Sequence, residues 1–475
     1  MSERIPPERF GLRPVAPAHV RELEGLLGMA AVFSGPDRLE AFASDETEKL
    51  RFPPDVAVLP SSAEEVAAVL RLAARELLPV VPRAAGTGLS GGALPVCGGI
   101  VLAVDRLDRI RAIDERDLVA ETEAGVVLAD LQQAVEARGL FYPPDPASRE
   151  TCRIGGNLAE DSAGPRSCKY GSTRHWVLGV EAVLADGSRL VAGGRSRKDA
   201  TGYNLTQLLV GSEGTLAVIT AATLRLIAKP KATLTAVLPF PTLAAAAGAV
   251  ERIFVEGLDP AACELAERAA LDAVARLEPL PPALAESAAM LVVELDGDDG
   301  DELLARAERL DALARSLGGG DALVADDAAG QRRLWQVRRR IGEAVKSLSV
   351  YKEADTVVPR SRLVELVEAA RAAAARQGLT ALLYGHAGDG NLHVNLLQGE
   401  LADSEWERRR DAAEEELFRA VVALGGRLTG EHGVGWTQRH LLPLALSERE
   451  IALQREIKRA FDPQGILNPG KIFPD

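Results

Sequence analysis

The chain has 475 residues, 47% of them hydrophobic and 26% charged, which is a globular composition and excludes a disordered protein. This length exceeds what one hydrophobic core normally serves, so we expect two domains, or one domain with a large insertion. A net charge of −14 argues against nucleic acid as a partner. No apolar run is long enough to span a membrane and the four cysteines form no C-x-x-C pair, so a cytoplasmic protein with reduced thiols is expected.

The first predicted element is a helix that begins after Ser62. Ser62 and Glu65 have the spacing of a capping box, and apolar residues recur at helical spacing from Val66 to Leu77. Two short apolar runs follow, Leu77–Val81 and Ile100–Val104, and we expect both to be strands.

A glycine-rich loop, Gly86 to Gly92, lies between these two strands. Its sequence satisfies G-x-G-x-x-G, the string that binds nicotinamide dinucleotides when a helix begins at the third glycine. Here residues 93–99 contain a proline and two glycines, so no helix can begin there. The loop therefore indicates a nest of free backbone N–H groups for a phosphate, against the alternative of a flexible surface turn.

The rest of the N-terminal half mixes helix and strand. A helix is predicted around Leu128–Val135, ended by Gly139. Three strands are expected at residues 177–184, 189–192 and 216–226, and the pairs Asp186-Gly187 and Gly193-Gly194 between them indicate hairpin turns.

A domain boundary is expected at Lys229-Pro230. Beyond it, strand-like runs alternate with helix-like ones, which predicts a second α/β domain. The expected strands are Leu234–Leu238, Met290–Leu295 and Thr356–Val358, and the expected helices include Asp301–Leu317 and Leu363–Gln377.

Further glycine clusters at Gly155-Gly156 and Gly211 to Gly214 predict more loops that approach a large ligand closely. The N-terminal half resembles the FAD-binding domain of the vanillyl-alcohol oxidase and p-cresol methylhydroxylase flavoproteins. The resemblance is carried by the glycine loop, YPPDPAS at residues 142–148, IGGNLAE at 154–160, KYG at 169–171 and VGSEGTLAVIT at 210–220. The resemblance implies FAD, and because nothing in these strings marks a covalent flavin link, we expect the FAD to be bound non-covalently. The FAD-contacting residues that it implies are Arg83, Ala84, Ala85, Gly86, Thr87, Gly88, Leu89, Ser90, Pro144, Asp145, Gly155, Gly156, Asn157, Glu213, Gly214 and Ile219.

Three of the six histidines occur in two glycine-rich strings of the C-terminal half, HAGDGNLH at 386–393 and GEHG at 430–433. A hairpin through the Gly-Asp-Gly turn would bring His386 and His393 together. Two imidazoles and a carboxylate suit a divalent transition metal, zinc, manganese or iron, which could chelate a 2-hydroxy acid. A zinc hydrolase would use similar ligands, but the spacing is wrong for H-E-x-x-H and the flavin loops would be unexplained.

These strings and ILNPGK at 466–471 resemble the family of the glycolate oxidase FAD subunit, D-lactate dehydrogenase and D-2-hydroxyglutarate dehydrogenase. The resemblance implies His386, His393 and Glu431 as metal ligands, His432 as the base and Asn468 as a flavin contact. It also implies Arg338 and Lys352 as contacts of the substrate carboxylate. For Arg338 the alternative is a solvated helix face, because four other arginines crowd beside it.

The fold expected from the whole sequence is an α+β, two-domain flavoprotein. It comprises an FAD-binding domain at residues 1–229, an α/β cap domain at 230–430, and a C-terminal segment at 431–475 that returns to the FAD domain. The expected activity is FAD-dependent oxidation of a D-2-hydroxy acid, with glycolate and D-lactate favoured over D-2-hydroxyglutarate. A flavin electron-relay subunit that is active only in a complex is the alternative of another class. Electrons would leave to an iron–sulfur subunit, an electron-transfer flavoprotein, quinone or oxygen.

Overall fold

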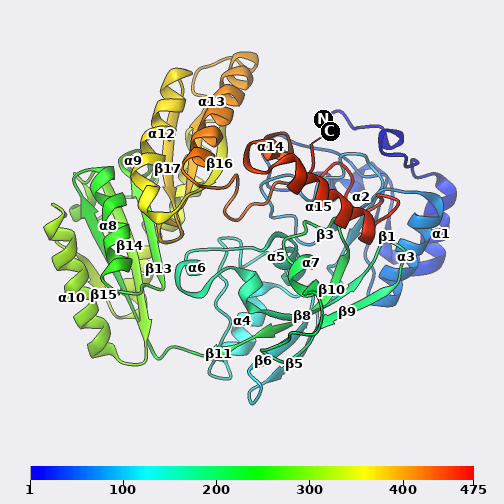
Figure 1. The fold of residues 1–475 in the computed structure, drawn as a ribbon, viewed down its shortest axis with the longest axis horizontal. Helices are drawn as coiled ribbons and strands as arrows, with labels where there is room; N and C mark the ends of the chain where they lie inside the picture. Colours follow the sequence, from blue (N-terminus) through cyan, green and yellow to red (C-terminus); the bar gives the residue numbers. More distant parts are fainter. Residues whose placement is uncertain (1, 475) are drawn as a thin grey trace. The chain divides into compact units, whose positions relative to one another are not determined.

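The computed structural model describes residues 2–474, which form two compact units (Figure 1). The first unit comprises the chain up to Ser162, Ser172–Lys229, and the chain from Glu431 onward. The second comprises Ala163–Gly171 and Pro230–Gly430. The second unit is therefore inserted into the sequence of the first.

Two main sheets build the first unit. In the first sheet, with strand order β1-β2-β4-β3, strands β2, β4 and β3 run parallel. The second is antiparallel, with order β5-β6-β10-β8-β9, and a short pair joins β7 and β11. The strands are β1 (Val32–Phe33), β2 (Val56–Val58), β3 (Val80–Arg83), β4 (Ile100–Ala103), β5 (Ile110–Asp114), β6 (Val119–Glu123), β7 (Leu140–Phe141), β8 (Val177–Val183), β9 (Arg189–Gly193), β10 (Val218–Arg225) and β11 (Ile227–Ala228).

The helices of the first unit are mostly short. They are α1 (Pro17–Leu27), α2 (Pro36–Leu39), α3 (Ala63–Glu76), α4 (Leu128–Glu136), α5 (Ile154–Glu160), α7 (Leu205–Leu209), α14 (Leu442–Ala445) and α15 (Glu448–Phe461), together with single-turn 3-10 helices at Pro7–Phe10, Met29–Ala31, Glu40–Phe42, Thr173–Trp176 and Arg439–Leu441.

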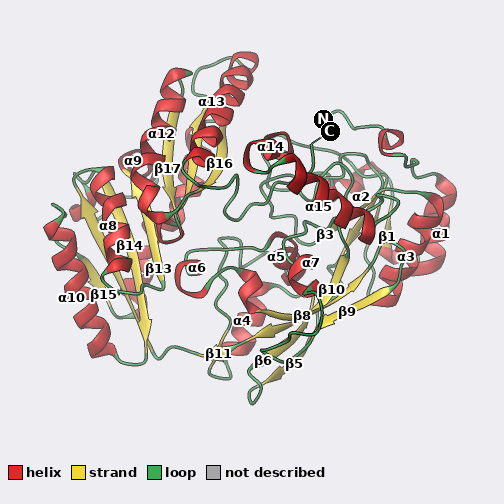
Figure 2. Ribbon diagram, in the orientation of Figure 1, coloured by secondary structure: helices red, strands yellow, loops and turns green. Residues whose placement is uncertain are grey.

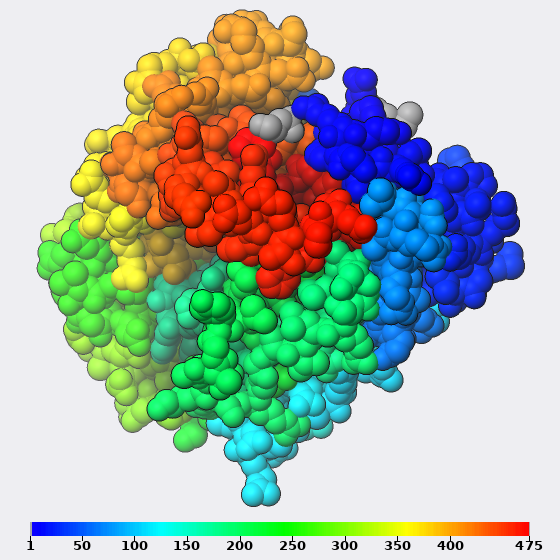
Figure 3. Space-filling view, turned by 45° about the vertical axis from the view of Figure 1, so that its right-hand side comes forward, coloured from blue at the N-terminus to red at the C-terminus, as the bar shows by residue number. Residues whose placement is uncertain are grey.

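The core of the first unit lies between α3 and the parallel sheet and takes in the end of the chain. Val66, Leu70 and Val80 are fully buried there, and so are Ile466 and Leu467. Leu467 pairs with Val80 in parallel, beside β3. The C-terminal residues, red in Figures 1 and 3, therefore complete the hydrophobic core of the unit that the N-terminal half begins.

The second unit is one antiparallel sheet of seven strands with helices on both faces (Figure 2). The strand order is β15-β12-β14-β13-β17-β18-β16. Helices α9 and α11 pack together on one face, whereas α12 and α13 pack against β17 and β16 on the other. The strands are β12 (Ala232–Phe240), β13 (Ala262–Glu267), β14 (Ala289–Gly297), β15 (Leu323–Ala325), β16 (Tyr351–Val357), β17 (Thr380–Gly385) and β18 (Asn391–Leu397).

The helices of the second unit include the longest of the part of the chain that the structure describes. They are α6 (Ser167–Tyr170), α8 (Leu243–Val255), α9 (Arg268–Ala275), α10 (Gly300–Ser316), α11 (Ala328–Leu348), α12 (Leu363–Arg376) and α13 (Asp403–Ala423), with 3-10 turns at Pro282–Leu284, Arg360–Arg362 and Ala387–Asp389. None of the helices described is long and apolar enough to cross a membrane.

Most predicted elements are present, with four local corrections. Ser62 caps α3 as expected, but the Glu65 carboxylate accepts from Ser61 N, at 2.6 Å, so the capping box is incomplete. The strand predicted from Leu77 begins at Val80, because Leu77 ends α3 with a φ of 57°. Asp186-Gly187 does turn the β8–β9 hairpin, but Gly193-Gly194 makes none, because α7 intervenes and β10 pairs with β8.

The fourth correction concerns Gly155 and Gly156, which were predicted to lie in a loop. They lie in the first turn of α5. A Cβ on Gly155 would be 2.8 Å from the Cβ of Ala124, and one on Gly156 would be 3.1 Å from the Cβ of Ala84. Glycine is needed because the helix lies too close to Ala124 and Ala84 for a side chain to fit. The sequence shows only that glycine is present, and such close packing occurs in helices as well as in loops.

Candidate active site

The glycine loop leaves β3 at Arg83 and reaches β4 without a helix, as expected. Gly86 has a φ of 72°, and a Cβ there would overlap the Arg83 guanidinium, which lies across the loop. Within the described chain, the backbone N–H groups from Gly86 to Leu89 make no hydrogen bond. The loop therefore has the free donors that an anion needs.

Two other segments were predicted to bind FAD, the start of α5 and the loop with Pro144 and Asp145. Gly156 of α5 contacts Ala84, so the first turn of α5 adjoins the glycine loop. The loop with Pro144 and Asp145 is held by Gln132 of α4, whose side-chain amide donates to Tyr142 O at 3.1 Å and to Pro144 O at 2.8 Å. The structure thus brings together Ala84 and Gly156 and fixes the backbone at Pro144.

Glu213 and Asn468, which were predicted to contact FAD, are bonded to each other and to the end of the chain. The Asn468 amide donates to Glu213 O at 2.7 Å and to Gly92 O at 2.9 Å. The Glu213 carboxylate accepts from Val434 N at 2.9 Å and Gly435 N at 2.7 Å. Gly214 follows in the same turn against Pro82, and Ile219 is buried in β10. The side chains of Glu213 and Asn468 therefore join segments that lie far apart in the sequence, and no sequence pattern indicated these contacts.

His432 lies on the segment that Glu213 holds. Its Nε2 is 3.7 Å from the Glu431 carboxylate, and its side chain is mostly buried. The next residues are tied to the glycine loop, because Trp436 N and Thr437 N donate to Ser90 O at 2.8 Å and 3.0 Å. The first unit therefore places the proposed base on a segment bonded to the proposed phosphate loop.

The second unit brings His386 and His393 together, as the hairpin predicted. Strands β17 and β18 pair in antiparallel fashion, the turn Ala387–Asp389 joins them, and the two imidazole centroids are 5.3 Å apart. His386 Nδ1 lies 2.8 Å from the Glu264 carboxylate. A carboxylate at one ring nitrogen orients the other nitrogen as a metal ligand.

Glu264 is fully buried and holds Arg338 as well as His386. The Arg338 Nε lies 2.8 Å from the Glu264 carboxylate, and its guanidinium stacks on Tyr384 at 4.9 Å. Burial acts to raise the pKa of Glu264, but His386 and Arg338 outweigh it, so that this pKa is lowered and the carboxylate stays charged. The alternative of a solvated helix face is wrong for Arg338, because its side chain is only 12% exposed.

Lys352 lies on the other face of β16. Asp355 pairs across the strands with His393, and side chains alternate along a strand, so Glu353 and Asp355 face the histidines. Lys352 faces α13 instead, where its Nζ is 3.4 Å from the Glu414 carboxylate. The expectation that Lys352 contacts the substrate is not supported by this placement, because the register turns it away from the histidines.

Two buried residues of the second unit had been missed. Asp355 accepts from Thr429 Oγ1 at 2.6 Å and from Gly430 N at 2.8 Å, so it fixes the backbone that leads directly into Glu431. Asn395 is fully buried and both polar atoms of its amide lack a partner. The alternation His393-Val394-Asn395 was the available signal, since it places Asn395 on the histidine face.

Comparison with known proteins identifies the family. The FAD binding domain matches residues 54–193, and the C-terminal domain of the FAD linked oxidases matches residues 229–472. The chain belongs to the FAD-linked oxidases. A glycolate oxidase subunit GlcD from Bacillus subtilis is 36% identical over 453 residues, which are 93% of this chain and 95% of that protein. A D-lactate dehydrogenase from Archaeoglobus fulgidus is 38% identical over 437 residues, covering 91% and 95% of the two chains.

Solved structures show the same fold at lower identity. p-Cresol methylhydroxylase with bound substrate superposes with a TM-score of 0.78 and 18% identity, covering 96% of each chain. This likeness confirms the two-domain flavoprotein fold. The protein is thus an enzyme of the FAD-linked oxidases, an oxidoreductase with an FAD-binding domain.

The first unit of this oxidase also fits FAD by its own chemistry. Arg83 Nη1, Ser90 Oγ and Asn157 Nδ2 are buried donors without a partner. Leaving such a group unbonded costs about 1–3 kcal/mol, so a resident ligand with acceptor oxygens is favoured. The free N–H groups of the glycine loop add donors of the same kind.

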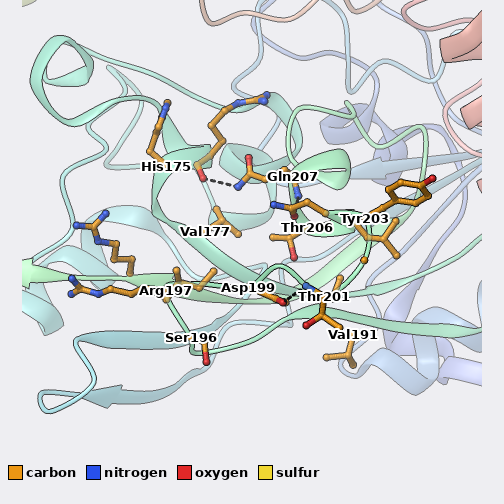
Figure 4. A pocket seen from close by; sticks show the side chains of 18 residues that line it. His175, Val177, Val191, Ser196, Arg197, Asp199, Thr201, Tyr203, Thr206 and Gln207 are labelled. Atoms are coloured by element: carbon orange, nitrogen blue, oxygen red, sulfur yellow. Dashed lines mark hydrogen bonds between the residues drawn. The ribbon is translucent and has the colours of Figure 1, made fainter.

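A separate cavity of the oxidase lies away from these residues (Figure 4). It has a volume of about 570 Å³ in the first unit, beside β8, β9 and α7, and Tyr203, Thr206 and Gln207 line it. None of the residues predicted to bind FAD, metal or substrate is among its lining residues. It is therefore no part of the candidate active site.

Proposed function

We propose that this oxidase converts a D-2-hydroxy acid, with glycolate and D-lactate favoured, into the 2-oxo acid. Relatives that align over almost the whole chain are named for glycolate and D-lactate, which supports this substrate class. The observation that carries the proposal is the buried pair His386 and His393, with His386 oriented by Glu264. Such a pair has the chemistry to hold a metal that binds the oxygens of a 2-hydroxy acid.

In this proposal His386, His393 and Glu431 hold a divalent zinc, manganese or iron ion. Glu264 fixes the ring of His386, and Asp355 holds the backbone at Gly430, the residue before Glu431. When bound, the metal supplies a Lewis acid for the substrate hydroxyl, and FAD supplies an acceptor for the hydride that leaves the α-carbon. His432 takes the hydroxyl proton, so that the carbonyl of the 2-oxo acid forms as the C–H bond breaks.

Two buried side chains of the histidine face are proposed to bind the substrate carboxylate. Asn395 has an amide donor with no partner, and a bound carboxylate would satisfy it. Arg338 lies on the same side of the sheet, although its Nε and Nη2 already bind Glu264. Lys352 faces α13, where it lies 3.4 Å from Glu414, so it is not placed to bind the distal carboxylate of D-2-hydroxyglutarate, and this placement disfavours that substrate.

The proposed location is the cytoplasm, because all four cysteines are free and three of them are buried. An iron–sulfur protein or an electron-transfer flavoprotein is the proposed electron acceptor. The name of one relative, a subunit of glycolate oxidase, is in keeping with an acceptor in a second chain.

Anaerobic bleaching of the flavin absorbance tests the proposal. The FAD-loaded protein is mixed with glycolate, D-lactate, L-lactate and D-2-hydroxyglutarate. We expect glycolate or D-lactate to reduce the flavin and L-lactate to leave it oxidised. If no acid reduces fully FAD-loaded protein, the proposal is refuted and the electron-relay alternative is favoured.

The roles of the metal and of His432 are tested separately. Protein freed of metal with a chelator should keep its FAD and lose reduction by substrate, and added zinc or manganese should restore it. Full activity in protein shown to be free of metal would exclude a catalytic metal. His432→Ala should bind FAD yet lose at least about a hundredfold in the rate of flavin reduction, the usual contribution of a general base.

A further inference from the structure

The segment that carries His432 has little stiffness of its own. Its sequence is Gly-Glu-His-Gly-Val-Gly, and Gly433 and Gly435 have φ angles of 75° and 52°. Glycine adopts such angles freely but also many others, so the place of the His432 ring depends on what the neighbouring backbone is bonded to.

Glu213 is what holds this backbone on one side. One carboxylate oxygen accepts from Val434 N at 2.9 Å and the other accepts from Gly435 N at 2.7 Å. A flat carboxylate that binds two successive N–H groups, one at each oxygen, fixes the orientation of both peptide groups. Hydrogen bonds to a charged acceptor are also about twice as strong as neutral ones.

Glu213 can serve as a fixed point because it is itself locked. It lies in the turn between α7 and β10 with a φ of 52°, donates its N–H to Ala159 O at 2.8 Å, and accepts from the Asn468 amide at 2.7 Å. Its side chain is buried. The bonds at its backbone fix where the side chain begins, and burial restricts the side chain itself.

We propose that Glu213 is a positioning residue of the reaction, which sets the place of the His432 side chain through the backbone of Val434 and Gly435. The proposal rests on the proposed function, in which His432 takes the proton. Glu213 does not touch the reacting atoms in this account, and acts only through the loop.

A second carboxyl group, Glu160, lies under the same loop and accounts for the glycine after the base. A Cβ on Gly433 would be 2.6 Å from Glu160 Oε2 and 3.0 Å from Glu213 Oε1, so only glycine lets the loop pass over the pair. Burial raises the pKa of Glu160 well above its usual value, and Glu213 adds to the rise. Burial raises the pKa of Glu213 too, but the N–H groups of Val434 and Gly435 oppose this. Of the two, Glu160 therefore takes a proton first as the pH falls.

Loss of the Glu213 carboxylate should loosen the loop without unfolding the unit. The far side of the loop is held independently, because Trp436 N and Thr437 N bond to Ser90 O. In Glu213→Gln one side-chain oxygen still accepts a hydrogen bond from the loop. The amide NH₂ group that replaces the other oxygen is itself a donor, so it cannot accept from the second backbone N–H. The variant thus releases one peptide group of the loop and keeps the side-chain volume.

Stopped-flow reduction of FAD-loaded enzyme is the main test. Substrate is whichever acid reduces the wild-type flavin, and Glu213→Gln is compared with Glu123→Gln. Glu123 is a matched control, since it is also buried in the first unit and accepts from a backbone N–H, that of Arg109 at 3.1 Å. We expect the limiting rate constant of Glu213→Gln to fall at least about tenfold, with half-saturation within about threefold of wild type, because a misplaced base affects the reaction and not binding. Glu123→Gln should stay within about twofold.

Hydrogen exchange gives a readout that does not depend on activity. Peptides covering residues 431–438 should exchange faster in Glu213→Gln, and at the wild-type rate in Glu123→Gln. Glu213→Asp serves as a second variant, because it keeps the charge but withdraws the oxygens, and the same loss is expected. A wild-type rate of reduction in Glu213→Gln would overturn the proposal, as would an equal loss in Glu123→Gln.

The same experiments separate this proposal from the proposed function. His432→Ala is measured in parallel. If substrate reduces its flavin as fast as that of wild type, the role of His432 as the base and the role of Glu213 as its positioning residue are both refuted. If no acid reduces the wild-type flavin, the proposed function fails. Hydrogen exchange at residues 431–438 in Glu213→Gln then still shows whether Glu213 holds the loop. Exchange at the wild-type rate refutes this role of Glu213 as well.

Discussion

Buried charge in the first unit is concentrated in a few residues around the end of the chain. Glu213 and Lys471 are buried and Glu160 is half-buried. The Lys471 ammonium donates to Leu94 O at 2.7 Å and to Asn468 Oδ1 at 3.2 Å. Burial lowers the pKa of Lys471 to about 8, against the opposing effect of the nearby carboxyl groups. At neutral pH the lysine is therefore mostly charged, and of the two carboxyl groups Glu160 holds its proton more tightly than Glu213.

Glu160→Gln should change how stability depends on pH. The folded pKa of Glu160 is raised above the usual 4.5, so the folded state binds the proton more tightly, and wild-type stability declines as pH rises from 4.5 through the folded pKa. Glutamine removes this contribution, so the stability of the variant relative to wild type should increase as the pH rises above about 4.5. The melting temperature of each protein, detected by the release of FAD, is measured between about pH 5 and pH 7. Lys471 does not interfere, because its pKa of about 8 keeps it charged at these pH values. Parallel pH profiles for the two proteins would contradict the assignment.

At the scale of elements, the sequence predicted what depends on neighbours in the chain. Ser62 and the apolar spacing behind it predict α3, and Asp186-Gly187 predicts the β8–β9 hairpin, because both are local signals. His386 and His393 flank one turn, so their approach was also local.

Contacts between distant segments could not be predicted in this way. Glu264 meets His386 only because β13 pairs with β17 in the sheet, and 122 residues separate the two in the chain. Glu213 and Gly435 are 222 residues apart. The order of strands decides such contacts, and a single sequence contains no periodicity that reports it.

The hairpin that presents the two histidines should be sensitive to one glycine. Gly390 has a φ of 76°, and a Cβ there would overlap the carbonyl oxygen of Val358. Gly399, after the same strand β18, has a φ of 56° with no atom within 4 Å of a Cβ. Gly390→Ala should lower stability by at least about 2 kcal/mol more than Gly399→Ala, because the two share the backbone strain and only the first has the overlap.

Chemical unfolding with both glycine variants checks this, and metal content per chain adds a direct readout. If the proposed metal site is correct, Gly390→Ala should contain less metal per chain than wild type, whereas Gly399→Ala should match wild type. Equal stability of the two variants would show that the turn yields to the added methyl group.

At the scale of the whole molecule, the chain leaves the first unit at Lys229, builds the second, and returns at Glu431. The returning segment has a structural role. Ile466 and Leu467 are fully buried in the core of the first unit, and Leu467 lies beside Val80, at the start of the strand that leads into the glycine loop. The first unit is therefore incomplete until the last residues are made.

A truncated chain tests this dependence. A chain that ends at Gly465 loses two fully buried apolar side chains, about 1.5–3 kcal/mol each, and the amide of Asn468 that joins Gly92 to Glu213. We expect it to bind less than about a tenth of the FAD per chain that the full chain binds, since the loss of several kcal/mol corresponds to a factor of that order or more. The control is a chain that ends at Ile472, which keeps Leu467 and Asn468 and the bond from Ile472 N to Gly435 O at 2.9 Å. FAD absorbance per chain after gel filtration gives the answer. Full occupancy in the chain that ends at Gly465 would mean that the FAD site forms without Leu467 and Asn468.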